Sequence, residues 1–221
     1  MLFQGDRIGL GIGLVLVGRL FMLGCGDSGG GDGPTATSDQ TCMDFAVFGE
    51  PAQSDYRLPY PVGDAWFLVQ SYCTVQGSHR NQLAYDFRMD VGAPITAARS
   101  GVVVNLMDNF PDDGINSNNF NFLIIHHDVG MFGFYAHHQQ GSARVQVGES
   151  VTTGQHIANA GQSGTGLPCV PRTCAILHFQ VSHTRRFQAE DDLGVNFRNA
   201  QGDLDRRSGL AVGVTYLALS D

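Results

Sequence analysis

The stretch Ser78–Val104, SHRNQLAYDFRMDVGAPITAARSGVVV, contains two short apolar runs separated by glycine, proline and aspartate. Runs of this length, bounded by residues that favour turns, are typical of β-strands, and neither has the period of a helix. The pattern recurs along the chain, so the sequence predicts an all-β domain, either a sandwich or a barrel. The expected strands are Ala65–Tyr72, Leu83–Arg88, Gly101–Met107, Asn121–His127, Phe132–His137, His156–Ala160, Leu177–Ser182 and Gly213–Ala218.

The segments between these runs are polar and rich in glycine. Residues 109–119, NFPDDGINSNN, predict a long polar loop. Residues 141–161 contain short apolar runs separated by glycine, and we expect a pair of strands that form a hairpin. The tail after Thr184 contains a charged patch and one further expected strand, which indicates an extension of the same domain.

The composition fits one folded domain with additions. Of the 221 residues, 43% are hydrophobic and only 15% are charged, which is enough apolar material for a sizeable core. The net charge is −8, and all 13 basic residues are arginines. Nucleic-acid binding requires a surface that neutralises phosphates, so this acidic chain without a basic patch is not expected to bind nucleic acid.

The N-terminus reads as a targeting segment. Residues 1–24 predict a signal peptide, because Arg7 precedes an apolar run and Met22-Leu23-Gly24-Cys25 resembles a bacterial lipobox. A lipid on Cys25 would anchor the chain to a membrane; a simple anchor or an ordinary cleaved signal peptide is the alternative. Residues 25–45 are expected to form a flexible tether, and residues 46–221 the β domain with its C-terminal extension.

Four cysteines remain after Cys25, and export would place them in an oxidising compartment where disulfides form. Cys169 and Cys174 are close in sequence and make a natural local pair, which leaves Cys42 to pair with Cys73. A thiolate zinc site is the competing interpretation, although no C-x-x-C spacing supports it.

Histidines and a carboxylate suggest a metal site. His79 and Asp86 occur in GSHRNQLAYDF, His137 in FYAHH and His178 in ILHFQV. Zinc prefers imidazole and carboxylate ligands, and a catalytic zinc site keeps one position open. Each histidine taken alone is more often a structural residue, so the surrounding motifs must decide.

Four ordered motifs carry a resemblance to the lysostaphin/LytM-type metallopeptidases over roughly residues 60–183. The first is Ser78–Val104, which includes a G-x-P-[VI]-x-A-x-x-x-G-x-V stretch. The second is NFLIIHHDVGMFGFYAHH, and the third is VQVGESVTTGQHIANAGQSGTG with its V-x-V-G-x-x-V-x-x-G-Q-x-I pattern. The last, LHFQV, is similar to the end of the family's His-x-His motif. The resemblance implies an antiparallel β-sandwich or open barrel of this family's type.

The resemblance also implies roles for individual residues. His79, Asp86 and His178 match the family's zinc ligands, and His137 matches a histidine that assists catalysis. The family's usual spacing is His-x-x-x-Asp; longer versions also occur, so the residues between His79 and Asp86 are expected to loop out. Where the family has a second catalytic histidine, this chain has Ile176. Tyr135 is expected to share a strand face with His137.

The function that the resemblance implies is a zinc endopeptidase, lipid-anchored in the bacterial cell envelope, that cleaves peptide cross-bridges of peptidoglycan. The alternative is a catalytically degenerate, zinc-binding relative that binds peptidoglycan or a partner protein, which Ile176 favours. A third interpretation is a ligand-binding β-sandwich whose histidines are incidental.

Overall fold

A computed structural model of the chain describes residues 41–74, 77–114, 118–165 and 175–220. The expected signal peptide, Cys25 and most of the expected tether lie outside these ranges, as do Cys169 and Cys174. Helices are short: α1 (Cys42–Phe45) and two 3₁₀ turns, η1 (Pro51–Gln53) and η2 (Asp128–Gly130). No helix within the described ranges is long and apolar enough to cross a membrane.

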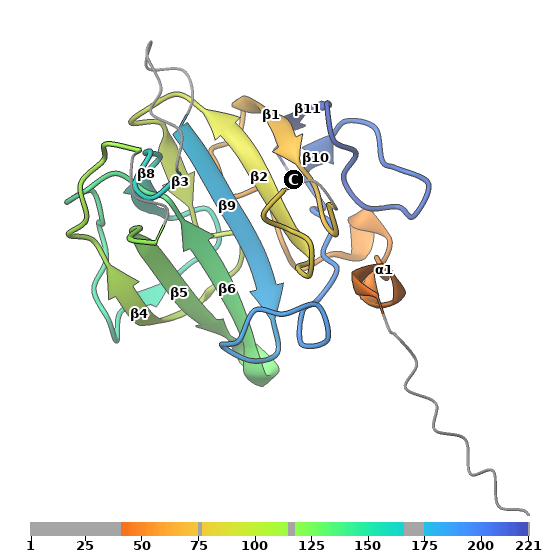
Figure 1. Cartoon of the computed structure of the whole chain (residues 1–221), viewed down its shortest axis with the longest axis horizontal. Coiled ribbons are helices and arrows are strands. Elements are labelled where there is room, and N and C mark those ends of the chain that lie inside the picture. Colours follow the sequence, from red (N-terminus) through yellow and green to blue (C-terminus); the bar gives the residue numbers. More distant parts are fainter. Residues whose placement is uncertain (1–40, 75–76, 115–117, 166–174, 221) are drawn as a thin grey trace, which may run out of the picture. The chain divides into compact units, whose positions relative to one another are not determined.

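The domain is built on a nine-stranded antiparallel sheet with the order β10-β11-β1-β2-β9-β6-β5-β4-β7 (Figure 1). The sheet has two free edges, so it does not close into a barrel, and the predicted all-β antiparallel class is confirmed. Each expected strand is present to within a few residues. The bounds are β1 (Ala65–Gln70), β2 (Ala84–Met89), β4 (Gly101–Met107), β5 (Phe122–His127), β6 (Met131–Ala136), β7 (Ser150–Val151), β9 (Ala175–Ser182), β10 (Ala200–Gln201) and β11 (Thr215–Ala218).

The expected hairpin within residues 141–161 is wrong. β7 pairs with β4, whereas β8 (His156–Asn159) pairs with β3 (Pro94–Thr96) in a separate two-stranded sheet. The turn that joins β7 to β8 is hydrogen-bonded to the segment that follows β3: Gly154 donates from its backbone N–H to the Ala97 carbonyl at 2.8 Å. Ala97 in turn donates to the Gln155 carbonyl at 2.9 Å, so the chain leaves β7 and follows β3.

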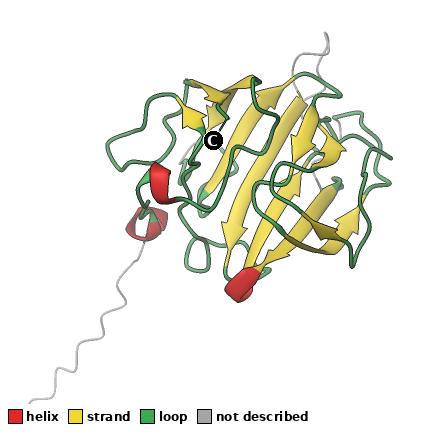
Figure 2. Cartoon of the chain, turned by 180° about the vertical axis from the view of Figure 1, so that it is seen from behind, coloured by secondary structure: helices red, strands yellow, loops and turns green. Residues whose placement is uncertain are grey.

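The core lies against one face of the large sheet. Side chains alternate along each strand, so Phe87 on β2 and Phe179 on β9 point to the same face, and both are fully buried. Phe197 from the C-terminal extension packs on both rings, with centroids 6.4 and 5.6 Å away. Figure 2 shows the connecting segments that cross this side of the sheet. The opposite face of β2 and β9 carries polar side chains, among them Asp86 and His178.

A disulfide joins Cys42 in α1 to Cys73 in the loop after β1, as the cysteine count predicts. The bond closes a loop between residues 31 positions apart. It attaches the last part of the expected tether, residues 41–45, to the region that follows β1.

Candidate metal centre

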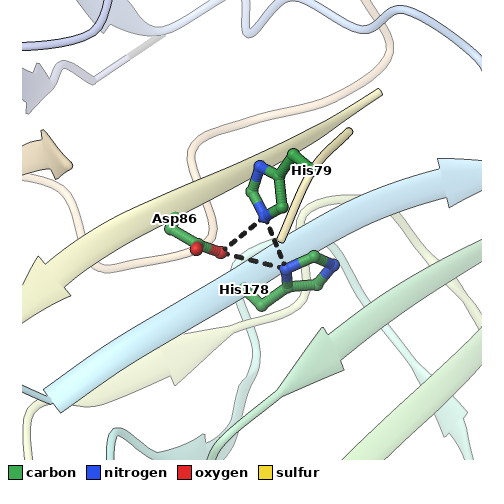
Figure 3. Close-up of side chains that lie close together, drawn as sticks. All are labelled: His79, Asp86 and His178. Atoms are coloured by element: carbon green, nitrogen blue, oxygen red, sulfur yellow. Dashed lines mark hydrogen bonds and ion pairs between the residues drawn. The ribbon is translucent and has the colours of Figure 1, made fainter. Parts of the chain in front are cut away.

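Asp86 and His178 lie side by side on the non-core face of the sheet, because β2 and β9 pair with these two residues in register. His79 comes from the turn between β1 and β2 and reaches the same point (Figure 3). The seven-residue spacing between His79 and Asp86 therefore does loop out, as expected. Three segments of chain bring one imidazole, one carboxylate and a second imidazole together.

The three side chains present three coordinating atoms to one point (Figure 3). His79 Nε2 lies 3.1 Å from Asp86 Oδ1 and 3.0 Å from His178 Nδ1, and His178 Nδ1 lies 2.9 Å from Asp86 Oδ1. Little solvent reaches them, since His79 is fully buried and only 13% of the Asp86 side chain is exposed. Two imidazole nitrogens and a carboxylate this close require a proton or a cation between them.

The outer nitrogen of each imidazole is already bonded. His79 Nδ1–H donates to the Ser71 carbonyl at 3.0 Å, and His178 Nε2–H donates to Gln180 Oε1 at 3.3 Å. The amide of Gln180 extends this series of hydrogen bonds, because its Nε2 donates to Asp192 Oδ2 at 2.5 Å. With the protons on the outer nitrogens, the inner nitrogens keep their lone pairs for a cation, which is the usual outer-shell arrangement of metal-binding histidines.

The charges within this cluster support one another. Burial opposes the charge on Asp86, but the adjacent His79 and His178 outweigh it and lower the pKa of the carboxyl below its usual range. Burial likewise opposes a charge on His178, yet its hydrogen bond and attraction to Asp86 raise the pKa of this imidazole. The cluster thus favours one positive charge next to the carboxylate, and a metal cation can take the place of that charge.

His137 lies beside the three residues but is positioned by a backbone turn. It follows β6 with φ +69°, so the alternation of side chains ends there. Its Nδ1 donates to the Ser163 carbonyl at 2.7 Å, and its ring centroid is 6.3 Å from that of His178. Burial, together with the charge of His178, lowers the pKa of His137 to about 4, which keeps the ring neutral.

The expectation that Tyr135 shares a face with His137 is wrong. Tyr135 is buried on the core side, opposite Phe179, and its hydroxyl accepts a hydrogen bond from the Ala98 N–H at 2.8 Å. The cleft is lined by Ala136 and His137, which are consecutive in sequence, although consecutive side chains of a strand normally point to opposite faces. The left-handed backbone at His137 accounts for this, because it turns the side chain out of the strand's alternation.

An open cleft of about 600 Å³ lies over the cluster and crosses β1, β2, β9 and β6. Ile176 contributes to its lining two residues before His178, so both side chains are on the same face. A half-buried aliphatic group therefore stands where the resemblance expects a second catalytic histidine. Phe120 and Phe134 line the β6 side of the cleft, and Arg88 lies on the β2 side.

The remaining described histidines do not line this cleft. His127 and His138 are buried and bonded to the Ser100 carbonyl at 2.9 Å and to Asp108 at 3.0 Å. His126 is exposed, and His156 bonds to a neighbouring asparagine at 2.7 Å. Sequence reasoning missed Gln180 and Asp192; the available signal was that Gln180, two residues after His178, has to share its strand face.

Comparisons with known proteins identify the family of the chain. A family model described as peptidase family M23 matches residues 80–190, half of the chain. None of the curated proteins matches. Among solved structures, a variant catalytic domain of the prophage-encoded M23 protein EnpA from Enterococcus faecalis is 18% identical, with a TM-score of 0.43; the match covers 61% of this chain and 93% of that one.

Two further structures have similar values. The catalytic domain of the antimicrobial peptidase lysostaphin from Staphylococcus simulans is 23% identical, with a TM-score of 0.40 and coverage of 59% and 86%. A zinc-containing peptidase from Vibrio cholerae is 22% identical, with a TM-score of 0.39, and the match covers 63% of this chain but 39% of that one. Because the family model matches half of its length, the chain belongs to peptidase family M23.

Proposed function

We propose that this chain is a zinc-dependent endopeptidase that cleaves the peptide cross-bridges of bacterial peptidoglycan. The observation that carries the proposal is the convergence of His79 Nε2, Asp86 Oδ1 and His178 Nδ1 at the floor of an open cleft. Membership of a zinc-dependent peptidase family supports it. The substrate is inferred from the resemblance to lysostaphin/LytM-type enzymes and from the expected export of the chain.

The three residues fit a zinc ion by their chemistry. Zinc binds imidazole nitrogen and carboxylate oxygen, and catalytic sites use three protein ligands and leave a fourth position open. Here both histidines have bonded outer N–H groups, which leaves the inner nitrogens as acceptors. The cluster borders the cleft through Asp86 and His178, so the open position would face the substrate.

A bound zinc ion would supply Lewis-acid polarisation of the scissile carbonyl and of the attacking water. The protein's own part falls to His137. Because Nδ1–H is committed to the Ser163 carbonyl, Nε2 carries the lone pair and can accept a proton from the attacking water. The same nitrogen can then return that proton to the leaving amine. Phe120 and Phe134 form an aromatic wall that can hold apolar parts of the peptide.

A second candidate function rests on Ile176. This side chain can neither donate nor accept a proton, so one hydrogen-bond donor expected at the cleft is missing. Removing one such donor typically lowers the rate about 100- to 1000-fold. If His137 cannot sustain hydrolysis alone, the chain would bind zinc and peptidoglycan, or a partner protein, without cleaving peptides.

Digestion of purified peptidoglycan separates the two functions. We expect the zinc-loaded chain to release cross-link fragments, a chelator to stop the release, and His137→Asn to abolish it while zinc remains. Asparagine is chosen because it tolerates the left-handed backbone at this position. Zinc binding without cleavage, together with cleavage that appears in Ile176→His, would assign the chain to the second function.

We further propose that the chain is exported and held in the cell envelope by a lipid on Cys25. The basis is the lipobox-like Met22–Cys25 and the glycine-rich residues that follow it. Incorporation of a labelled fatty acid into the wild-type chain, but not into Cys25→Ser, is the expected result. Equal labelling of both chains, or none, would count against the anchor.

A further inference from the structure

Arg88 is the only basic residue other than histidine among the described residues that line the cleft. It lies two positions after Asp86 on β2, so its side chain emerges on the same face of the sheet as the metal-site carboxylate. Its register partners are Ile176 on β9 and Phe67 on β1. Arg88 thus occupies the side of the cleft opposite the aromatic wall of Phe120 and Phe134.

The guanidinium of Arg88 is held in place without being neutralised. It lies over the Phe67 ring with Cζ 5.8 Å from the centroid, and this contact orients the group while leaving its N–H donors available. Arg88 is exposed, and no carboxylate within the described ranges forms an ion pair with it. In a chain with a net charge of −8, an arginine kept unpaired beside a cleft is a site for an anion.

We propose that Arg88 binds a carboxylate of the peptide substrate, and that this contact makes the enzyme selective for peptides carrying an acidic group near the scissile bond. The inference rests on the proposed peptidase function and adds the substrate class. A planar guanidinium matches a carboxylate through two parallel hydrogen bonds, a fit that lysine lacks.

Strand geometry sets the distance between this carboxylate and the metal centre. Two residues along β2 separate Arg88 from Asp86 by about 7 Å, and an extended peptide advances about 3.4 Å per residue. The carboxylate recognised by Arg88 therefore lies within about two residues of the scissile bond. Either the C-terminal carboxylate of a short peptide or an acidic side chain satisfies this requirement.

The test uses the full zinc-loaded chain and two pairs of synthetic peptides. The first pair is N-acetylated hexaglycine with a free C-terminal carboxylate or with a C-terminal amide. The second pair is amide-capped and carries glutamate or glutamine at an internal position. Glycine is chosen because it offers no side chain, so a difference within a pair reports the carboxylate alone. Affinities are measured by NMR titration, which also detects weak binding.

We expect the acidic member of at least one pair to bind about 10-fold more tightly than its neutral partner, as for a charge-assisted hydrogen-bond pair at a partly exposed site. Which pair shows the difference identifies the source of the carboxylate. Arg88→Gln should remove the preference and Arg88→Lys should retain part of it. The matched control Arg144→Gln removes the same charge from an exposed arginine that does not line the cleft, and it should keep the full preference.

Two results would overturn the proposal: no preference within either pair, including no binding at all, or a preference that survives in Arg88→Gln. Cleavage of the same peptides is followed in parallel. An Arg88-dependent preference without cleavage would support the carboxylate subsite and refute the peptidase. Cleavage of the peptides without any binding preference within either pair would support the peptidase and refute the subsite.

Discussion

Gln180→Leu tests whether the outer contacts of His178 determine metal affinity. Gln180 is fully buried; its Oε1 accepts from His178 Nε2–H at 3.3 Å, and its Nε2 donates to Asp192 Oδ2 at 2.5 Å. Leucine keeps a similar volume but removes both bonds. The His178 ring then loses the contact that fixes its proton on Nε2, and its buried N–H is left without a partner. Asp192, whose Oδ1 already has no partner, keeps the Leu83 N–H at 2.9 Å as a donor to Oδ2.

The magnitude follows from these two bonds. Loss of an outer-shell partner of a metal-binding histidine typically lowers metal affinity about 10- to 100-fold. Each buried polar group left without a partner costs about 1–3 kcal/mol, so the free energy of unfolding should also fall. Zinc affinity is measured by competition with a chelator of known affinity, and stability by urea unfolding of the metal-free chain.

Asn196→Leu is the matched control for Gln180→Leu. Asn196 is a buried amide that donates to the Gly49 and Ser208 carbonyls at 2.6 and 2.8 Å, and it does not border the metal cluster. This variant should lose comparable stability and keep wild-type zinc affinity. If Gln180→Leu also kept wild-type affinity, the outer contact would be structural only and the reasoning would be refuted.

Two further predictions concern stability. Burial lowers the pKa of His127 from 6.5 to about 4. The unfolded chain therefore takes up a proton on this residue at a higher pH than the folded chain does. As the pH drops from 6.5 to 4, this difference should lower the free energy of unfolding by about 3 kcal/mol. Urea unfolding across that range should show a flatter profile for His127→Gln, and parallel profiles would contradict the assignment. Replacing Cys42 and Cys73 with serine should lower the free energy of unfolding by about 4 kcal/mol, because the bond closes a loop between residues 31 apart; a double variant as stable as the wild type would rule this out.

Much of the fold was predictable because apolar runs and turn residues mark strands directly. Gly101–Met107 has the expected bounds, and the other expected strands differ at their ends only. The separate partners of β7 and β8 were not predictable. They depend on hydrogen bonds between the turn at Gly154 and Ala97, which is far away in sequence. Period and composition carry no information on such distant partners.

The same division applies to the site. The motifs brought out His79, Asp86 and His178, and the structure places their coordinating atoms together. The orientation of His137 depends on a left-handed backbone that strand alternation does not anticipate. The hydrogen bond from Gln180 to Asp192 joins a strand to a later loop. The position of Gln180 could be inferred from its spacing to His178, whereas the position of Asp192 could not.

The zinc content of the purified full chain tests the central claim most directly. We predict stoichiometric zinc in the wild type and in His137→Asn, and loss of zinc in His178→Ala, because His178 Nδ1 is one of the three converging ligand atoms whereas His137 is not. A wild-type chain without zinc, or a His178→Ala chain that retains it, would contradict the assignment of this cluster as the metal centre.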